Sequence, residues 1–231
     1  MTSASTFTDL VATSSAAANA AHHPPEQSER ARRQAEVVEA LRPHVPAHAL
    51  LYQSEDTTPY ECDGLTAYRQ RPLLVCLPET YAQVQAVLKT CHAIGAPVIA
   101  RGAGTGLSGG AMPHPMGVTL SLAKFNKILK VDAYSRTALV QCGVRNLAIS
   151  EAAAPYGLYY APDPSSQIAC TIGGNVAENS GGVHCLKYGL TVHNVLKVKG
   201  FSIEGEPVEF GSDALDTPGL DLLAIMIGSE G

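Results

Sequence analysis

Residues 98–110 read VIARGAGTGLSGG, a short β-branched run followed by a loop in which five of the last ten residues are glycine. Glycine tolerates left-handed backbone conformations and lets other atoms approach the main chain closely. Such a run presents successive N–H groups without side chains, an arrangement that binds anions and phosphates above all. The stretch therefore predicts a strand leading into a phosphate-binding loop; a flexible surface loop without a ligand is the alternative.

The residues before this loop predict a compact β-α-β unit. Residues 73–77 are continuously apolar, which indicates a strand buried on both faces. A helix runs from about residue 80 to Gly95, and a second strand covers 96–100. The two strands are expected to pair in parallel through a right-handed crossover. The glycine loop then lies at the carboxyl end of the second strand, where open α/β sheets bind ligands.

The rest of the chain predicts an α+β fold built from two α/β subdomains. The second part is expected to be a mainly antiparallel sheet with flanking helices. Its strands are expected at 117–122, which alternates, and at 128–132, 137–143, 195–203 and 208–210, with a helix at 148–154. The predicted organisation is a disordered tail at 1–28, an N-terminal helical segment at 29–58, a first subdomain at 59–112 and a second, incomplete at its C-terminus, at 113–231.

Composition excludes several classes of function. The chain has 231 residues, 45% of them hydrophobic, and a net charge of −5, so nothing favours a nucleic-acid partner. No apolar run approaches the roughly 20 residues that span a bilayer, and the N-terminus lacks the pattern of a secretory signal. Six cysteines without a C-x-x-C pair indicate reduced thiols and a cytoplasmic location. His184 and His193 have no carboxylate or cysteine partner at metal-ligand spacing, so structural roles and no metal site are expected.

The loop matches the dinucleotide fingerprint G-x-G-x-x-G at Gly104, Gly106 and Gly109, but a Rossmann site is rejected. That site needs a helix to begin inside the loop, and Pro113 and Pro115 prevent one. A cradle formed by the loop's own amides remains. Arg101 at its entrance is expected to support either a phosphate or a structural carboxylate.

A second stretch, residues 161–182, is also rich in glycine and small polar residues. The two stretches suggest two walls of one extended ligand site, and two unrelated tight turns are the alternative. Cys170 and Cys185 have no histidine at a telling position, and Ser165 and Ser166 lack the G-x-S-x-G elbow, so nucleophilic catalysis is unsupported.

The motifs at 101–110, 161–167, 170–179 and 228–231 resemble the flavin-contacting segments of the vanillyl-alcohol-oxidase-type, or PCMH-type, FAD-binding family. The resemblance covers roughly residues 35–231. Further segments are similar to the glycolate-oxidase-type members, which share many motifs with D-lactate and D-2-hydroxyglutarate dehydrogenases. These segments are 59–64, 143–150 and 184–194.

The resemblance implies a cofactor site for FAD. It places the pyrophosphate on the loop and the ribityl chain and isoalloxazine on the second stretch, and Glu230 completes the pocket. The loop residues are Arg101, Gly102, Ala103, Gly104, Thr105, Gly106, Leu107, Ser108 and Gly109; those of the second stretch are Asp163, Ser165, Ser166, Cys170, Thr171, Gly173, Gly174, Ala177, Asn179 and Gly181. Some members attach FAD through a histidine in this loop; residues 101–110 contain none, so non-covalent binding is expected.

The implied activity is FAD-dependent oxidation of a 2-hydroxy acid, glycolate or D-lactate, to the 2-oxo acid. The implied partners are a second flavin-domain subunit and an iron–sulfur subunit, through which the protein could associate with a membrane. Family members continue after the segment matching 228–231 into a substrate-capping domain, so residues 1–231 are expected to be a fragment, inactive alone, with no catalytic residue of their own. A non-catalytic nucleotide- or phosphate-binding module is the alternative.

Overall fold

The computed structural model describes residues 27–214 and 219–230. The tail expected at 1–28 lies outside these residues except for Gln27 and Ser28, which begin the first described helix, and Gly231 also lies outside them. No helix in the described ranges is both long and apolar enough to cross a bilayer.

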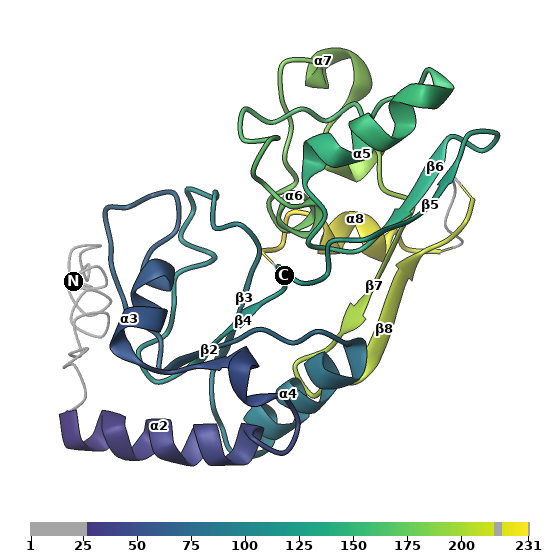
Figure 1. The fold of residues 1–231 in the computed structure, drawn as a ribbon. Coiled ribbons are helices and arrows are strands. Elements are labelled where there is room, and N and C mark those ends of the chain that lie inside the picture. The colour runs from purple at the N-terminus through teal and green to yellow at the C-terminus, as the bar shows by residue number, and fades with distance from the viewer. Residues whose placement is uncertain (1–26, 215–218, 231) are drawn as a thin grey trace, which may run out of the picture.

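A four-stranded sheet lies above helix α2 (Gln27–Leu41) in the lower part of the molecule (Figure 1). Its strands lie in the order β1 (Leu50–Leu51), β2 (Leu74–Cys76), β4 (Val118–Ser121) and β3 (Val98–Arg101). Strands β2 and β3 both run parallel to β4, whereas β1 pairs with β2 in the antiparallel sense. Helices α2 and α4 (Tyr81–Ala93) pack below this sheet, and the short α3 (Ser54–Thr57) lies beside it.

Local sequence signals account for these helices. Thr80 caps α4. Its hydroxyl accepts a hydrogen bond from the backbone amide of Gln83, and the side-chain oxygen of Gln83 accepts one from the backbone amide of Thr80. The apolar stripe of this helix, formed by Val84, Val87, Leu88 and Cys91, is buried, and Gly95 ends the helix with a left-handed φ of 64°. Helix α2 presents its own apolar residues to the same core, and its Arg30 and Gln34 side chains donate to the carbonyls of residues 72 and 73.

The expected direct pairing of the strands at 73–77 and 96–100 is wrong. They are parallel, but β4 lies between them, with Thr119 opposite both Val75 and Ile99. The strand expected in the second subdomain is thus the centre of the first sheet, and the boundary at residue 112 separates it from its neighbours. The apparent alternation at 117–122 comes from Thr119 and Ser121, whose small hydroxyl side chains are fully buried.

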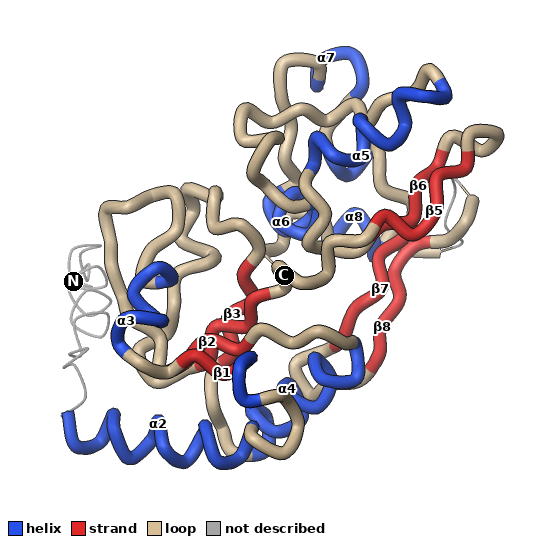
Figure 2. Tube along the Cα trace, viewed as in Figure 1, coloured by secondary structure: helices blue, strands red, loops and turns tan. Residues whose placement is uncertain are grey.

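The second part of the chain is less regular (Figure 2). Its strands pair antiparallel, as expected, but in the described residues they form two separate hairpins rather than one sheet. The hairpins are β5 (Ile128–Asp132) with β6 (Thr137–Val140) and β7 (Lys197–Phe201) with β8 (Pro207–Gly211). The helices of this part are α5 (Asn146–Ala153), α6 (Ile172–Glu178), α7 (Cys185–Tyr188) and α8 (Leu222–Met226), and its 3-10 turns cover Ala154–Tyr156 and Thr191–His193. Two further 3-10 turns, Ala47–Ala49 and Thr58–Tyr60, belong to the first part of the chain.

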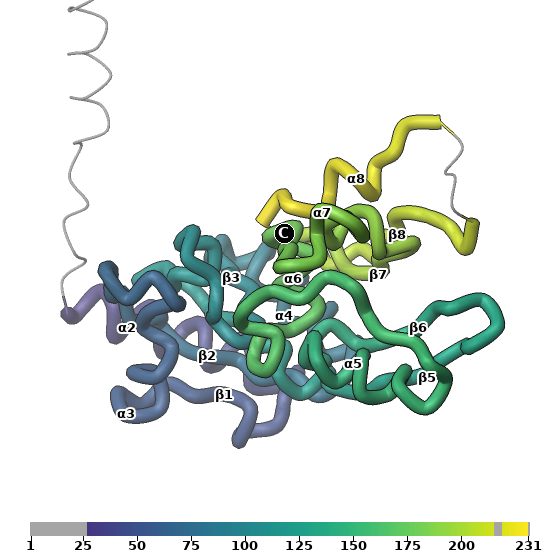
Figure 3. Tube along the Cα trace, turned by 90° about the horizontal axis from the view of Figure 1, so that it is seen from above, coloured from purple at the N-terminus to yellow at the C-terminus, as the bar shows by residue number. Residues whose placement is uncertain are grey.

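Residues distant in sequence meet at α6. The segment after α8 runs along this helix, and α8 lies close to α6 in Figures 1 and 3. The Gly228 amide donates to the Val176 carbonyl at 2.8 Å, and the Glu230 amide to that of Ala177 at 2.9 Å. The end of the described chain is therefore fixed beside the helix that lies within the second glycine-rich stretch.

Candidate cofactor-binding site

The glycine loop begins where β3 ends, at Arg101, on the carboxyl edge of the parallel sheet. The backbone N–H groups of residues 102–108 have no hydrogen-bond partner within the described part of the chain. The next amide, that of Gly109, donates to Asp63 Oδ2 at 3.1 Å, and Asp63 is only 4% exposed. A buried carboxylate thus already binds one amide of the loop, and the preceding amides remain open to a further anion.

Helix α6 forms the facing wall. The Ser108 hydroxyl donates to Glu178 Oε2 at 2.9 Å, and Thr171 Oγ1, at the N-cap of α6, lies against Gly102. A Cβ at Gly106 would lie 2.8 Å from Glu178 Oε1, the end of a flexible side chain, so the loop and the Glu178 carboxylate are in direct contact there. The two glycine-rich stretches therefore meet, and their joint binding of one ligand stays a prediction.

The C-terminal segment forms a third wall. Glu230 is held beside α6 by its own amide, and its Oε2 atom lies where a Cβ of Gly110 would stand. The loop, α6 and Glu230 therefore lie against one another, and a ligand site formed by the motifs at 101–110, 170–179 and 228–230 stays a prediction.

Arg101 has a partner that the sequence did not suggest. Its Nη1 donates to the Cys62 carbonyl at 2.8 Å, and the guanidinium lies 5.5 Å from the centre of the Tyr60 ring. The side chain is buried, and burial lowers the pKa of the guanidinium. Arg101 therefore fixes the turn at residues 60–63 under the loop, and a contact with pyrophosphate stays a prediction.

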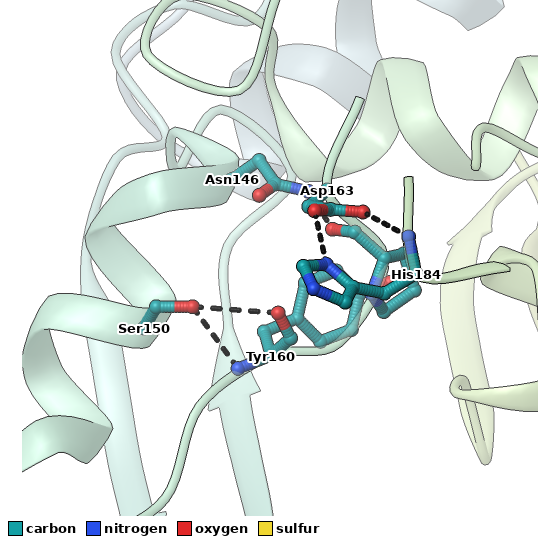
Figure 4. Close-up of polar contacts among 6 residues, drawn as sticks. Asn146, Ser150, Tyr160, Asp163 and His184 are labelled. Atoms are coloured by element: carbon teal, nitrogen blue, oxygen red, sulfur yellow. Dashed lines mark hydrogen bonds and ion pairs between the residues drawn. The ribbon is translucent and has the colours of Figure 1, made fainter. Parts of the chain in front are cut away.

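Asp163 and His184 form a close pair on the second stretch (Figure 4). Asp163 Oδ2 lies 2.6 Å from His184 Nδ1, and Oδ1 accepts from the His184 amide at 3.2 Å. The hydrogen bond from the His184 side chain lowers the pKa of the Asp163 carboxyl. The expectation that His184 lacks a carboxylate partner holds for sequence spacing but is wrong in space, because its partner lies 21 residues earlier.

Other residues of this stretch support its backbone. Asn146 Nδ2 donates to the Pro162 carbonyl at 3.0 Å, and the Ser150 hydroxyl contacts the Tyr160 amide and carbonyl (Figure 4). Cys170 is buried, and burial raises the pKa of its thiol, which disfavours a nucleophilic role. Within the described residues, no hydrogen bond joins the loop to Asp163, Ser165 or Ser166.

Sequence reasoning missed two residues at the loop, Asp63 and Glu178. Both stand inside quoted motifs, at 59–64 and 170–179, but their contacts with Gly109 and Ser108 cross 46 and 70 residues of chain. Periodicity and motif spacing carry no signal for such a pairing.

Comparison with known proteins places the chain in a family. A model of the family described as "FAD binding domain" matches residues 72–211. The chain is 63% identical over 195 residues to the glycolate oxidase subunit GlcD of Escherichia coli (strain K12), covering 84% of this chain and 39% of that protein. It is 38% identical over 159 residues to a D-lactate dehydrogenase of Archaeoglobus fulgidus, covering 68% and 35%. The chain thus spans about two fifths of the length of these relatives.

A solved structure shares the fold. An alkyldihydroxyacetonephosphate synthase structure matches with a TM-score of 0.72 at 23% identity, covering 85% of this chain and 38% of that one. FAD is the cofactor of the family, and the open amides at 102–108 fit a diphosphate-bearing ligand. The expected α+β fold class and the expected cofactor are confirmed. The chain belongs to the PCMH-type FAD binding domain family.

Proposed function

We propose that this chain is the FAD-binding part of a flavoprotein dehydrogenase that oxidises a 2-hydroxy acid, glycolate or D-lactate, to the 2-oxo acid. The observation that carries the proposal is the 63% identity to a glycolate oxidase subunit over 195 residues. The D-lactate dehydrogenase at 38% identity supports the same substrate class.

In this proposal the loop holds the pyrophosphate through the amides of residues 102–108, and Glu230 closes the pocket. The ribityl chain and isoalloxazine lie along the stretch from Asp163 to Gly181. When bound, FAD accepts the hydride from the α-carbon of the substrate. Binding is non-covalent, because residues 101–110 lack the histidine that attaches FAD in some family members.

The proposed partners are a second flavin-domain subunit and an iron–sulfur subunit. The relative's description as a subunit supports an assembly. An iron–sulfur cluster needs several cysteine ligands, and the six cysteines of this sequence contain no C-x-x-C pair, so such a cluster would lie outside residues 1–231. Purification of the tagged chain together with any bound partner proteins, followed by iron analysis of the complex, tests the proposed partners.

The test of FAD binding uses the whole chain, purified and titrated with FAD while flavin absorbance and fluorescence are followed. We expect saturable binding that is weakened at least tenfold in Gly64→Ala, because a Cβ there would lie 2.7 Å from the Thr105 carbonyl oxygen and 2.9 Å from that of Gly106 and would displace the backbone of the loop. Gly200→Ala is the matched control, since the nearest atom to a Cβ there is 4.0 Å away in β7. Acid precipitation should release the FAD; FAD retained by the denatured polypeptide contradicts non-covalent binding.

A folded chain that is colourless and does not bind added FAD would contradict the proposal. It would favour the alternative, a nucleotide- or phosphate-binding module without redox chemistry. Titration with ADP-ribose, which carries the same diphosphate link but no flavin, separates the two. An assay of glycolate oxidation coupled to reduction of a dye then tests whether residues 1–231 are active alone. We expect no activity, because the chain spans 39% of the length of its relative.

A further inference from the structure

The short helix α7 carries three polar side chains on one face. His184 immediately precedes the helix, and Lys187 and Tyr188 follow it by three and four residues, so all three share one side of a helical turn. The backbone amides of Lys187 and Tyr188 donate to the His184 carbonyl at 3.1 and 3.0 Å, which fixes this turn. All three side chains are exposed, and α7 lies at the upper edge of the second part of the chain, above α6, in Figure 1.

Asp163 orients the imidazole of His184 (Figure 4). Its Oδ2 atom lies 2.6 Å from His184 Nδ1, and its Oδ1 atom accepts from the His184 amide at 3.2 Å. The hydrogen bond from His184 lowers the pKa of the Asp163 carboxyl, which keeps it ionised at neutral pH. An ionised carboxylate only accepts hydrogen bonds, so Nδ1 carries the proton, and Nε2 of the neutral ring is an acceptor. Among the described residues, Nε2 has no hydrogen-bond partner.

The ring of Tyr188 positions the ammonium group of Lys187. Lys187 Nζ lies 4.9 Å from the centre of this ring, a cation–π contact. The Tyr159 ring packs edge-on against Tyr188 at 6.0 Å, and the His184 ring lies 6.5 Å away, so Tyr188 connects the ammonium and imidazole groups. Within the part of the chain that the structure describes, Lys187 forms no ion pair with a carboxylate. Its charge can therefore be offset by a bound anion.

This face of α7 adjoins the stretch that is proposed to hold the isoalloxazine. Asp163 begins that stretch, and Gly181 ends it three residues before His184. A 2-hydroxy acid presents a carboxylate and, on the neighbouring carbon, a hydroxyl group. An ammonium group without a counterion matches the carboxylate, and an imidazole acceptor matches the hydroxyl group. A carboxylic acid without the hydroxyl group satisfies only the first contact.

We propose that Lys187 binds the carboxylate of the 2-hydroxy acid and that His184 Nε2 accepts a hydrogen bond from its α-hydroxyl group. Asp163 and Tyr188 are positioning residues for these two contacts. The inference rests on the proposed function for the class of substrate, and it gives this chain a share of the substrate site in addition to the cofactor site.

Titration of the isotope-labelled whole chain with glycolate at mildly alkaline pH, followed by NMR of the His184 imidazole, measures this binding. Acetate lacks the hydroxyl group and glycolamide lacks the charge. We expect each to bind about threefold to fivefold more weakly than glycolate, the effect of one exposed contact. Lys187→Met should weaken glycolate and acetate by a similar factor and leave glycolamide unchanged. Lys187→Arg keeps the charge and should stay within about twofold of the wild type.

Asp163→Asn tests the orientation of the imidazole. The asparagine amide can donate to Nδ1, which places the ring proton on Nε2 and removes the acceptor. We expect the preference for glycolate over acetate to disappear while acetate binding is unchanged, a result that a purely structural role of Asp163 does not produce. Lys124→Met is the matched control, because Lys124 is exposed and lies outside α7. Circular dichroism checks that each variant is folded.

The same titration of the FAD-saturated chain separates this inference from the proposed function. Glycolate should shift the flavin absorbance spectrum of the wild type and not that of Lys187→Met. The inference is overturned, while FAD binding stands, by equal binding of glycolate and acetate, by no saturable binding, by binding that survives Lys187→Met, or by an unchanged flavin spectrum. A chain that does not bind FAD contradicts the proposed function instead, and the titration without FAD then decides the inference through the same ligands and variants.

Discussion

The region around the four-stranded sheet and the region from residue 143 onward are stabilised in different ways. The first encloses one continuous apolar core, in which Leu41, Leu73, Leu74, Val87 and Val118 are fully buried. The second has a small cluster built on Val144, Ile149 and Ile172. Its other buried side chains include polar ones, and Asn146 and Thr191 bond to backbone carbonyls.

Because the two regions are stabilised differently, the two sides of the candidate cofactor site differ as well. The glycine loop extends from β3 of the first region, and its Gly109 amide donates to the buried Asp63 carboxylate. The walls that face it, α6 and Glu230, belong to the region held by individual hydrogen bonds. A ligand that bridges the two should therefore stabilise the second region more than the first.

The largest effect is expected from damage to the apolar core of the first region. Leu74→Ala in β2 should lower the free energy of unfolding by about 2–5 kcal/mol, because it leaves a cavity between packed side chains. Urea denaturation followed by circular dichroism measures the loss. Leu139→Ala, at a position 58% exposed in β6, should stay within about 0.5 kcal/mol of the wild type. Equal losses in the two variants would show that the packed core around Leu74 is not what stabilises the first region.

Local patterns predicted α4 and β2 of this first region, but not the short β1 and α3. The apolar stripe ending at Cys91 and the cap at Thr80 predict α4, and the apolar run at 73–77 predicts β2. Each of these patterns lies within the element that it predicts. Strand order is different, because no local pattern records that β4 enters between β2 and β3. Thr119 and Ser121 made β4 resemble a half-exposed strand, whereas the sheet buries both faces of it.

A smaller effect is expected where a single hydrogen bond carries the packing. Asn146→Ala leaves the buried Pro162 carbonyl without its donor. It should cost about 1–2 kcal/mol, at the lower end for such a loss, because Asn146 Oδ1 has no partner in the described residues. Hydrogen exchange should show faster opening near residues 158–163 and little change in α4. Asn126→Ala, at an exposed position, is the control; opening spread evenly over both regions would refute the local role.

The site was predictable where its chemistry is carried by the backbone. Glycine density located the loop, and the prolines that follow it excluded a Rossmann helix. Side-chain partners escaped prediction because each joins residues far apart: Glu178 with Ser108, Arg101 with the Cys62 carbonyl, and Asp163 with His184. Such pairs are tertiary contacts, and a single sequence does not show which distant residues contact each other.

The smallest effect is expected at the Asp163–His184 pair, which is open to solvent, so its contribution stays below about 1 kcal/mol. Because the fold lowers the pKa of Asp163, the pair stabilises the protein above the ordinary carboxyl pKa and stops doing so as the pH falls through the lowered value. Asp163→Asn should therefore be less stable than the wild type at neutral pH and equal to it in acid, by urea denaturation at both. Asp56→Asn on exposed α3 controls for loss of one charge. A carbon NMR titration in which His184→Ala leaves the Asp163 pKa unchanged would remove His184 as the cause.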